Sequence, residues 1–166
     1  MNTSAAATHR SAFFALLKNP FKFRLFLLQK LPAAYFSGLK LQAVNDESCE
    51  VTVPFKWFTR NPFRSTYFAC LGMAAEMTTG ILAMAHVYGR KPAVSMLVVG
   101  VEGRFYKKAT GLTRFVCTEG RQIAEAVQKA VDLSAPQTIN ALSSGYNPEG
   151  ELLAEFRITW SFRAKQ

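Results

Sequence analysis

One charged residue lies in the middle of the longest apolar stretch of this chain. Glu76 is the sole formal charge between Thr66 and Val87, and its nearest neighbours are alanines and methionines. A carboxylate in such surroundings loses hydration, which raises its pKa toward the range useful for a general base. It could accept a proton from water during a hydrolysis, or it could simply hydrogen-bond to a neighbouring group. We expect a working site.

The apolar stretch must form either a membrane span or a buried helix. It is long enough to cross a bilayer. A carboxylate at its centre makes a lone span costly, and the sequence offers no second span to pair with it. A helix that is apolar on all sides is instead typical of a protein core in which a sheet wraps around it. Thr66 is expected to cap its N-terminus.

A sheet can cover only one side of such a helix. The other side must meet a second subunit or a ligand, because an apolar face left in water is unfavourable. This argument predicts a homo-oligomer, either a dimer or a dimer of dimers.

The composition indicates one globular domain with a basic surface. Of 166 residues, 49% are hydrophobic and 19% are charged, which is enough to bury a core. The net charge of +9 suits a phosphate-bearing ligand, an anionic membrane surface or nucleic acid. Nucleic acid is the least favoured, since the sequence has neither zinc-ligand spacing nor an RNA-binding motif. Three cysteines at unrelated spacings predict no disulfide framework, and we expect a cytoplasmic protein.

We expect residues 1–31 to form a tail and a helical arm that precede the main domain, which comprises residues 32–166. Aromatic and basic side chains alternate from Ser11 to Leu31, and Asn19-Pro20 should divide this segment into two helices. Residues 1–10 are rich in alanine, serine and threonine and are expected to be loose. The arm either packs on the domain, which is the favoured interpretation, or lies on a membrane surface.

Alternating apolar and polar residues predict strands on both sides of the long helix. The clearest alternation runs from Leu152 to Phe162. The nearly continuous apolar run Val94–Val101 is typical of a strand covered on both faces. Further strands are expected at residues 39–43, 51–55, 112–117 and 138–144, and a second helix is expected at residues 120–133. An α+β fold follows, with an antiparallel sheet of about six strands wrapped around one long central helix.

This layout, with the segment RNPFRST before the long helix (Arg60–Thr66) and Glu76 on it, resembles the hot-dog fold. It is most similar to thioesterase-like proteins of the PaaI type, and specifically to the DUF4442 group, over roughly residues 30–164. The resemblance implies an asparagine in the loop before the helix and an acidic residue on the helix, here Asn61 and Glu76. It also implies a hydroxyl on the following strand, for which Ser95 is the candidate.

The resemblance implies an acyl-CoA or acyl-carrier thioesterase in which Glu76 activates a water molecule. Asn61 and Ser95 would orient the water or the carbonyl, and backbone N–H groups around Tyr67–Cys70 would bind the oxyanion. Neither a cofactor nor a metal is expected. The residues expected to bind the thioester ligand are Arg60, Arg64, Tyr67, Phe68 and Arg104, the arginines because guanidinium groups bind phosphate in a bidentate manner.

A second interpretation is a non-catalytic protein of the same fold that binds an acyl group or lipid. Many relatives have a histidine or a glycine pair near the helix start that holds the thioester carbonyl, whereas this chain has Phe63-Arg64-Ser65-Thr66. That departure favours binding without catalysis. The spacing between Asn61 and Glu76 favours hydrolysis.

Overall fold

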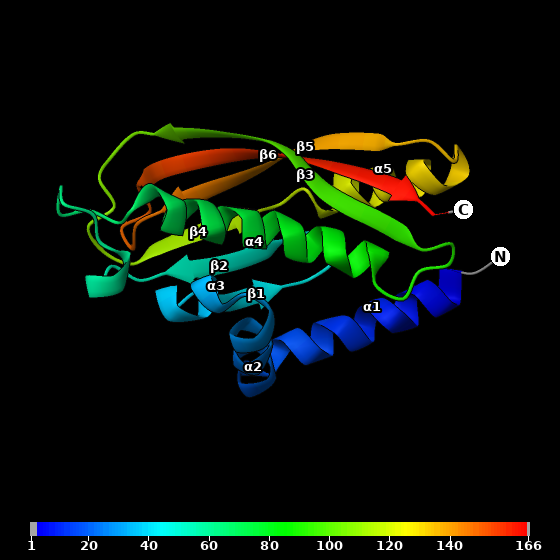
Figure 1. Cartoon of the computed structure of the whole chain (residues 1–166), viewed down its shortest axis with the longest axis horizontal. Helices are drawn as coiled ribbons and strands as arrows, with labels where there is room; N and C mark the ends of the chain where they lie inside the picture. Colours follow the sequence, from blue (N-terminus) through cyan, green and yellow to red (C-terminus); the bar gives the residue numbers. More distant parts are fainter. Residues whose placement is uncertain (1–2, 166) are drawn as a thin grey trace.

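The computed structural model describes residues 3–165, in which helices and strands follow the predicted order. The helices are α1 (Thr3–Lys18), α2 (Pro20–Lys30), α3 (Pro32–Ser37), the 3-10 helix η1 (Trp57–Thr59), α4 (Phe68–Val87) and α5 (Gly120–Asp132). The strands are β1 (Lys40–Val44), β2 (Cys49–Val53), β3 (Val94–Phe105), β4 (Thr113–Cys117), β5 (Gln137–Tyr146) and β6 (Leu152–Ala164). The predicted α+β class is therefore confirmed (Figure 1).

The arm consists of α1, α2 and the unpredicted short helix α3. Asn19 ends α1 and caps α2, because its side-chain oxygen accepts a hydrogen bond from the Lys22 N–H at 3.0 Å. Helix α1 begins at Thr3, so the prediction of loose residues before Ser11 was wrong for residues 3–10. Consecutive alanines at positions 5–7 favour helix, and the later turns of α1 pack on the domain. Residues 1 and 2 lie outside the described residues.

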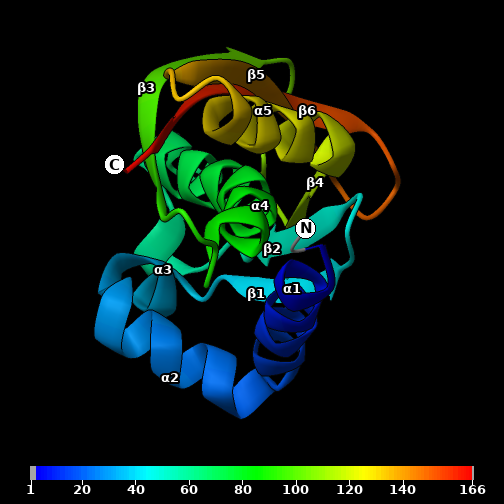
Figure 2. The ribbon, with the colours of Figure 1, turned by 90° about the vertical axis from the view of Figure 1, so that its right-hand side faces the viewer.

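One six-stranded antiparallel sheet curls around α4. The strand order is β1-β2-β4-β5-β6-β3, with each neighbouring pair antiparallel. Figure 2 shows the sheet passing from β1 beneath α4, through β2 and β4, to β5, β6 and β3 above it, with α5 on the same inner side. The predicted wrapping of the helix by one sheet is thus confirmed. This curvature lets the sheet cover several sides of α4, so the expectation that a sheet covers only one side of the helix was wrong.

Helix α4 meets the length and composition test for a membrane span, but it is the core of this fold. Its buried side chains lie on several sides of the helix and contact β2, β4, β5, β6 and α5. Such burial removes the need for a polar face, which explains the apolar sequence. The fully buried residues on α4 are Ala74, Ala75, Thr78, Thr79, Leu82 and Ala83.

One face of α4 nevertheless remains uncovered within the described chain. Met73, Glu76 and Gly80 are half-buried and Met84 is exposed, and their spacing of three to four residues places them on one face. The adjacent strand β3 is a sheet edge that pairs, among the described strands, with β6 alone. Its exposed apolar side chains are Leu97, Val99, Val101 and Phe105, so the prediction that the run Val94–Val101 is covered on both faces was wrong for the single chain. A long apolar edge strand is a surface on which a further strand can pair.

Two buried hydrogen bonds fix α4 against the sheet. The Thr78 and Ser143 hydroxyls lie 2.8 Å apart, and both side chains are fully buried. At the next residue of α4, Trp160 Nε1 donates to Thr79 Oγ1 at 2.9 Å. Together the two bonds set the rotation of α4 about its axis relative to the sheet. They therefore also set the direction in which Glu76, on the preceding turn, points.

Replacing Thr78 by valine should lower the free energy of unfolding by about 1–3 kcal/mol, because the Ser143 hydroxyl would lose its partner inside the core. Chemical denaturation measures this loss. Adding Ser143→Ala to Thr78→Val should recover part of it, since the unpaired hydroxyl is then gone.

The matched control is Thr138→Val, the same change at an exposed position of β5, which should alter stability by less than about 0.5 kcal/mol. Equal losses in Thr78→Val and Thr138→Val would show that the buried pair does not anchor the helix.

Candidate active site

An apolar hollow opens at the N-terminal end of α4. Its volume is about 490 Å³, a size that suits a small organic ligand. Two loops form it, one before α4 and the other between β3 and β4. The lining residues are Asn61, Pro62, Phe63, Ser65, Thr66, Tyr67, Phe68, Leu71, Phe105, Tyr106, Lys107, Lys108 and Ala109. Three sequence-predicted site residues, Asn61, Tyr67 and Phe68, are among them.

Asn61 organises the loop on which it lies. Its Oδ1 accepts hydrogen bonds from the backbone N–H groups of Phe63 at 2.9 Å and Ser65 at 3.2 Å. Its Nδ2 donates to Ser65 Oγ at 3.1 Å. This turn lets Arg64 adopt a φ of 60°, a left-handed value that residues other than glycine rarely adopt. The asparagine thus shapes one wall of the hollow through the backbone that it holds.

Thr66 connects the two loops instead of capping the helix. Its backbone N–H and its hydroxyl both donate to the Ala109 carbonyl, at 2.7 and 3.1 Å. Tyr67 occupies the N-cap position without a side-chain hydrogen bond, so the prediction that Thr66 caps α4 was wrong. Pairing with a residue more than forty positions later satisfies the threonine better than a local cap could. Thr66 and Ala109 both line the hollow, so this contact joins its two loops.

The start of α4 presents unpaired backbone donors. The Tyr67 N–H donates to the Thr59 carbonyl and the Cys70 N–H donates to the Tyr67 carbonyl, at 2.7 and 2.9 Å. Within the described residues, the N–H groups of Phe68 and Ala69 have no backbone or side-chain acceptor. Both belong to the first turn, where the helix dipole is positive. Phe68 lines the hollow, so its N–H is a donor that an anionic oxygen there could reach, and the Ala69 N–H is the next along the chain.

Glu76 does not line this hollow. It lies eight residues beyond Phe68, about 12 Å along the axis of α4. Its carboxylate lies over Gly80, where a β-carbon would come within 3.0 Å of Oε1. Its side chain makes no hydrogen bond or ion pair with any described residue, and burial raises the pKa of the Glu76 carboxyl above its usual value.

Ser95 lies on the opposite face of the sheet from α4. It pairs with Arg163 at the start of β3, and its hydroxyl donates to the Arg163 carbonyl at 3.1 Å. Paired residues point to the same side of a sheet, and Arg163 is exposed between the inward-facing residues of β6. One chain therefore does not bring Ser95 near Glu76 or Asn61.

The predicted phosphate-binding arginines surround the hollow without lining it. Arg60 and Arg64 are exposed on the loop before α4, and Arg104 forms an exposed ion pair with Glu102 at 3.1 Å. The hollow instead contains Lys107 and Lys108, which belong to the same basic cluster in the sequence but were not among the residues chosen as ligand-binding. Their signal was the segment Phe105-Tyr106-Lys107-Lys108, in which aromatic and basic residues follow a strand. Lys107 also pairs with Glu151 at 2.6 Å, whereas Lys108 has no described partner.

Within the part of the chain that the structure describes, no group of His, Cys, Asp and Glu side chains could hold a metal ion. The three cysteines are buried and unpaired, and burial raises the pKa values of the Cys49 and Cys117 thiols. The chemistry of the hollow therefore depends on backbone N–H groups, lysines and aromatic rings.

Comparison with protein families identifies the group to which this site belongs. A family model described as a domain of unknown function, DUF4442, matches residues 22–161. The chain belongs to the DUF4442 family. This confirms the family predicted from the loop and the central helix. Among curated protein sequences, none matches the chain.

Solved bacterial structures share the fold of this DUF4442 protein. A protein of unknown function from Pseudomonas aeruginosa, described as a probable thioesterase, aligns with a TM-score of 0.73 and 19% identity, covering 88% of this chain and 97% of that one. A protein of unknown function from Chlorobaculum tepidum aligns with a TM-score of 0.72 and 16% identity, covering 88% of this chain and 97% of that one. A thioesterase from Haemophilus influenzae aligns with a TM-score of 0.61 and 17% identity, covering 84% of this chain and 88% of that one. These likenesses establish the predicted hot-dog fold.

Replacing Glu76 by glutamine should stabilise the fold at neutral pH. Because burial raises its pKa, folded Glu76 binds its proton more tightly than the unfolded chain does, so its contribution to stability falls as pH rises above about 4.5. Glutamine carries no charge and avoids that loss. Thermal unfolding between pH 4 and 8 should show a higher melting temperature for Glu76→Gln at pH 7.5, by about 2–4 °C per kcal/mol. The difference should vanish near pH 4.

Glu125→Gln, the same change on the exposed face of α5, controls for the loss of one charge and should not shift the melting temperature. If Glu76→Gln instead lowers stability at pH 7.5, the carboxylate has a partner that stabilises its ionised form.

Proposed function

We propose that this protein hydrolyses a thioester, with an acyl-CoA or an acyl-carrier thioester as its substrate. The observation that carries the proposal is Glu76, a half-buried carboxylate on an uncovered face of an otherwise apolar helix, without a described partner. Desolvation of this kind moves a carboxyl toward the pKa range of a general base. A carboxylate with only a structural role would be expected to have a hydrogen-bond partner.

In the proposed reaction, Glu76 removes a proton from a water molecule as the water oxygen attacks the thioester carbonyl carbon. The carbonyl oxygen becomes an oxyanion, which the N–H groups of Phe68 and Ala69 stabilise at the positive end of α4. The carbon–sulfur bond then breaks, the carboxylic acid is released, and the departing thiolate takes up the proton. No protein residue is covalently modified during these reaction steps.

The separation of Glu76 from these donors means that one chain does not complete the site. We therefore propose a dimer that pairs two copies along the β3 edge and covers the open face of α4. Antiparallel pairing about a two-fold axis reverses the direction of the second chain, which can bring its Glu76 toward the hollow of the first. The exposed apolar residues of β3 support this arrangement, because pairing would bury them.

The same hollow supports the proposed ligand class. Its walls are mainly aromatic and aliphatic, which suits an acyl group or the pantetheine arm. Lys108 lies at the hollow, and Arg60, Arg64 and Arg104 lie on the loops and strand end around it. These cations could bind the phosphates of coenzyme A or of a carrier-bound pantetheine.

A non-catalytic acyl-binding protein is the second candidate, and the hydrogen bonds of Asn61 favour it. Both side-chain atoms of its amide already bind the loop residues Phe63 and Ser65. An asparagine committed in this way is less free to orient a water molecule or a carbonyl. The hollow, the basic residues and the dimer would be the same in this case, and only the chemistry would be lost.

Thiol release from a panel of short, long and aryl acyl-CoA substrates tests the proposal. We expect turnover by the wild-type protein and a loss of about 10²–10⁴-fold in kcat for Glu76→Gln, the usual contribution of a general base. Glu125→Gln should retain full activity, since it lies on an exposed surface of α5.

Full activity of Glu76→Gln would exclude Glu76 as the base. Absence of turnover on every substrate, combined with acyl-CoA binding in calorimetry, would favour the acyl-binding alternative.

A further inference from the structure

Helix α2 carries apolar side chains on two opposite faces, and the core explains only one of them. Phe23 and Leu27 point into the protein and are buried. Phe21, Leu25 and Leu28 recur every three to four residues on the other side, and their exposed fractions are 78%, 45% and 43%. A helix on a protein surface normally has a polar outer face. We call Phe21, Leu25 and Leu28 the outer stripe.

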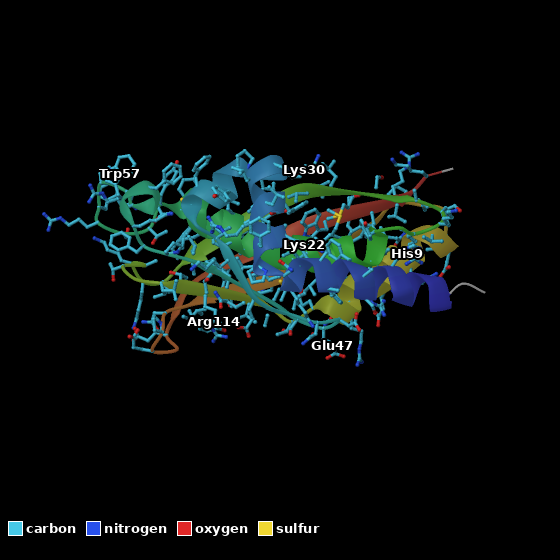
Figure 3. The ribbon with its side chains drawn as sticks, turned by 90° about the horizontal axis from the view of Figure 1, so that it is seen from below. His9, Lys22, Lys30, Glu47, Trp57 and Arg114 are labelled. Atoms are coloured by element: carbon cyan, nitrogen blue, oxygen red, sulfur yellow. The ribbon has the colours of Figure 1, made fainter. Side chains whose placement is uncertain are left out.

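Basic residues flank the outer stripe on both sides. Lys22 and Arg24 lie beside it around the helix, and Lys18 precedes it at the end of α1; all three are exposed. Lys30 is also exposed, but it lies in the last turn on the same face as Phe23 and Leu27. Figure 3 looks onto this side of the molecule and labels Lys22 and Lys30 on α2. Arg24 also lies over the Tyr35 ring, with 4.5 Å between the guanidinium carbon and the ring centroid. The stripe therefore has a cationic border.

No acidic residue occurs in the sequence before Asp46, although this part of the chain contains Arg10, Lys18, Lys22, Arg24, Lys30 and Lys40. The arm therefore has a uniformly positive charge, apart from the ion pair that Arg10 makes with Asp46 at 2.6 Å. The other acidic residues all follow Asp46 and lie on the domain. Such a segregation of charge favours an anionic partner.

The arm lies apart from both surfaces that the proposed function uses. No residue of α2 lines the hollow, and α2 contacts α1 and α3 rather than β3. Figure 2 shows α2 at the far side of β1 from the β3 edge. The outer stripe therefore remains exposed in a dimer that pairs along β3, and the inference below does not depend on the proposed function.

We propose that α2 docks this protein on the surface of an anionic membrane. In this arrangement the helix lies in the plane of the interface, with Phe21, Leu25 and Leu28 inserted at the boundary between headgroups and acyl chains. Lys18 and Lys22 bind lipid phosphate and carboxylate groups. A second copy of α2 is a poorer occupant, because two such faces would bring their cations together. Nucleic acid would satisfy the cations and leave the outer stripe in water.

The test is cosedimentation of the full-length protein with vesicles of phosphatidylcholine containing 30% phosphatidylserine, and with vesicles of phosphatidylcholine alone. We expect binding to the anionic vesicles at low salt, at least tenfold weaker binding to the neutral vesicles, and release at 0.5 M NaCl.

Two double variants separate the apolar and the electrostatic contributions. Phe21→Ser with Leu25→Ser should weaken binding at least tenfold, because the inserted side chains are lost. Lys18→Glu with Lys22→Glu should weaken it at least as much, since each lysine contributes about fivefold near an anionic surface. All four positions are exposed, so unchanged melting temperatures would verify that the fold is retained.

The matched control is Lys129→Glu with Lys165→Glu, which makes the same change in net charge at exposed positions outside the arm. It should retain at least half of the vesicle binding. Equal loss in this control would overturn the proposal, because net charge alone would then explain the binding. The proposal would also be overturned if the wild-type protein failed to bind anionic vesicles. It would be overturned as well if light scattering gave Phe21→Ser/Leu25→Ser a lower mass than the wild-type protein, because the occupant of the outer stripe would then be a second copy.

Discussion

The burial of α4 is the constraint on which the rest of this structure depends. A twenty-residue helix with apolar side chains on every side must be covered on every side, and one curved antiparallel sheet covers most of it. Covering the helix in this way leaves two surfaces incomplete, the face of α4 that carries Glu76 and the edge strand β3. Since these surfaces are adjacent, a second copy that covers one can cover the other. In the proposed dimer, the association of the two chains and the placement of the site would then have the same physical cause.

The same burial gives the candidate site its chemistry. Loss of hydration raises the pKa of the Glu76 carboxyl, and the unpaired N–H groups at the beginning of α4 are unsatisfied because no side chain caps the helix there. Thr66 could have supplied such a cap, but it binds Ala109 and thereby joins the two loops of the hollow. One helix thus provides a general-base candidate near its middle and oxyanion donors at its start. About 12 Å separates them along the axis, so they serve one substrate only if two chains meet.

Local pattern was sufficient to predict every strand and the long helix, although not α3 or the first turns of α1. Non-local contacts decided most of what was missed at the site. The alternation in β6 and the uniform apolarity of α4 are properties of short segments, and both predictions were confirmed. The role of Thr66 depends on Ala109, and Lys108 reaches the hollow through a loop more than thirty residues after the helix start. Ser95 was a reasonable candidate from its position along the chain. Its side of the sheet depends on the pairing with Arg163, which the sequence alone does not specify.

The measurement that tests the two-chain site most directly is the activity of a mixed dimer. One chain would carry Glu76→Gln and the other Phe68→Pro, which removes an oxyanion donor at the first helical position, where Tyr67 already has the extended backbone that proline requires. The two chains are co-expressed with different affinity tags and purified as the mixed species. Each parent dimer should be inactive, whereas the mixed dimer should recover about half of the wild-type activity, since one of its two sites is intact. A mixed dimer as inactive as its parents would contradict a site built from two chains.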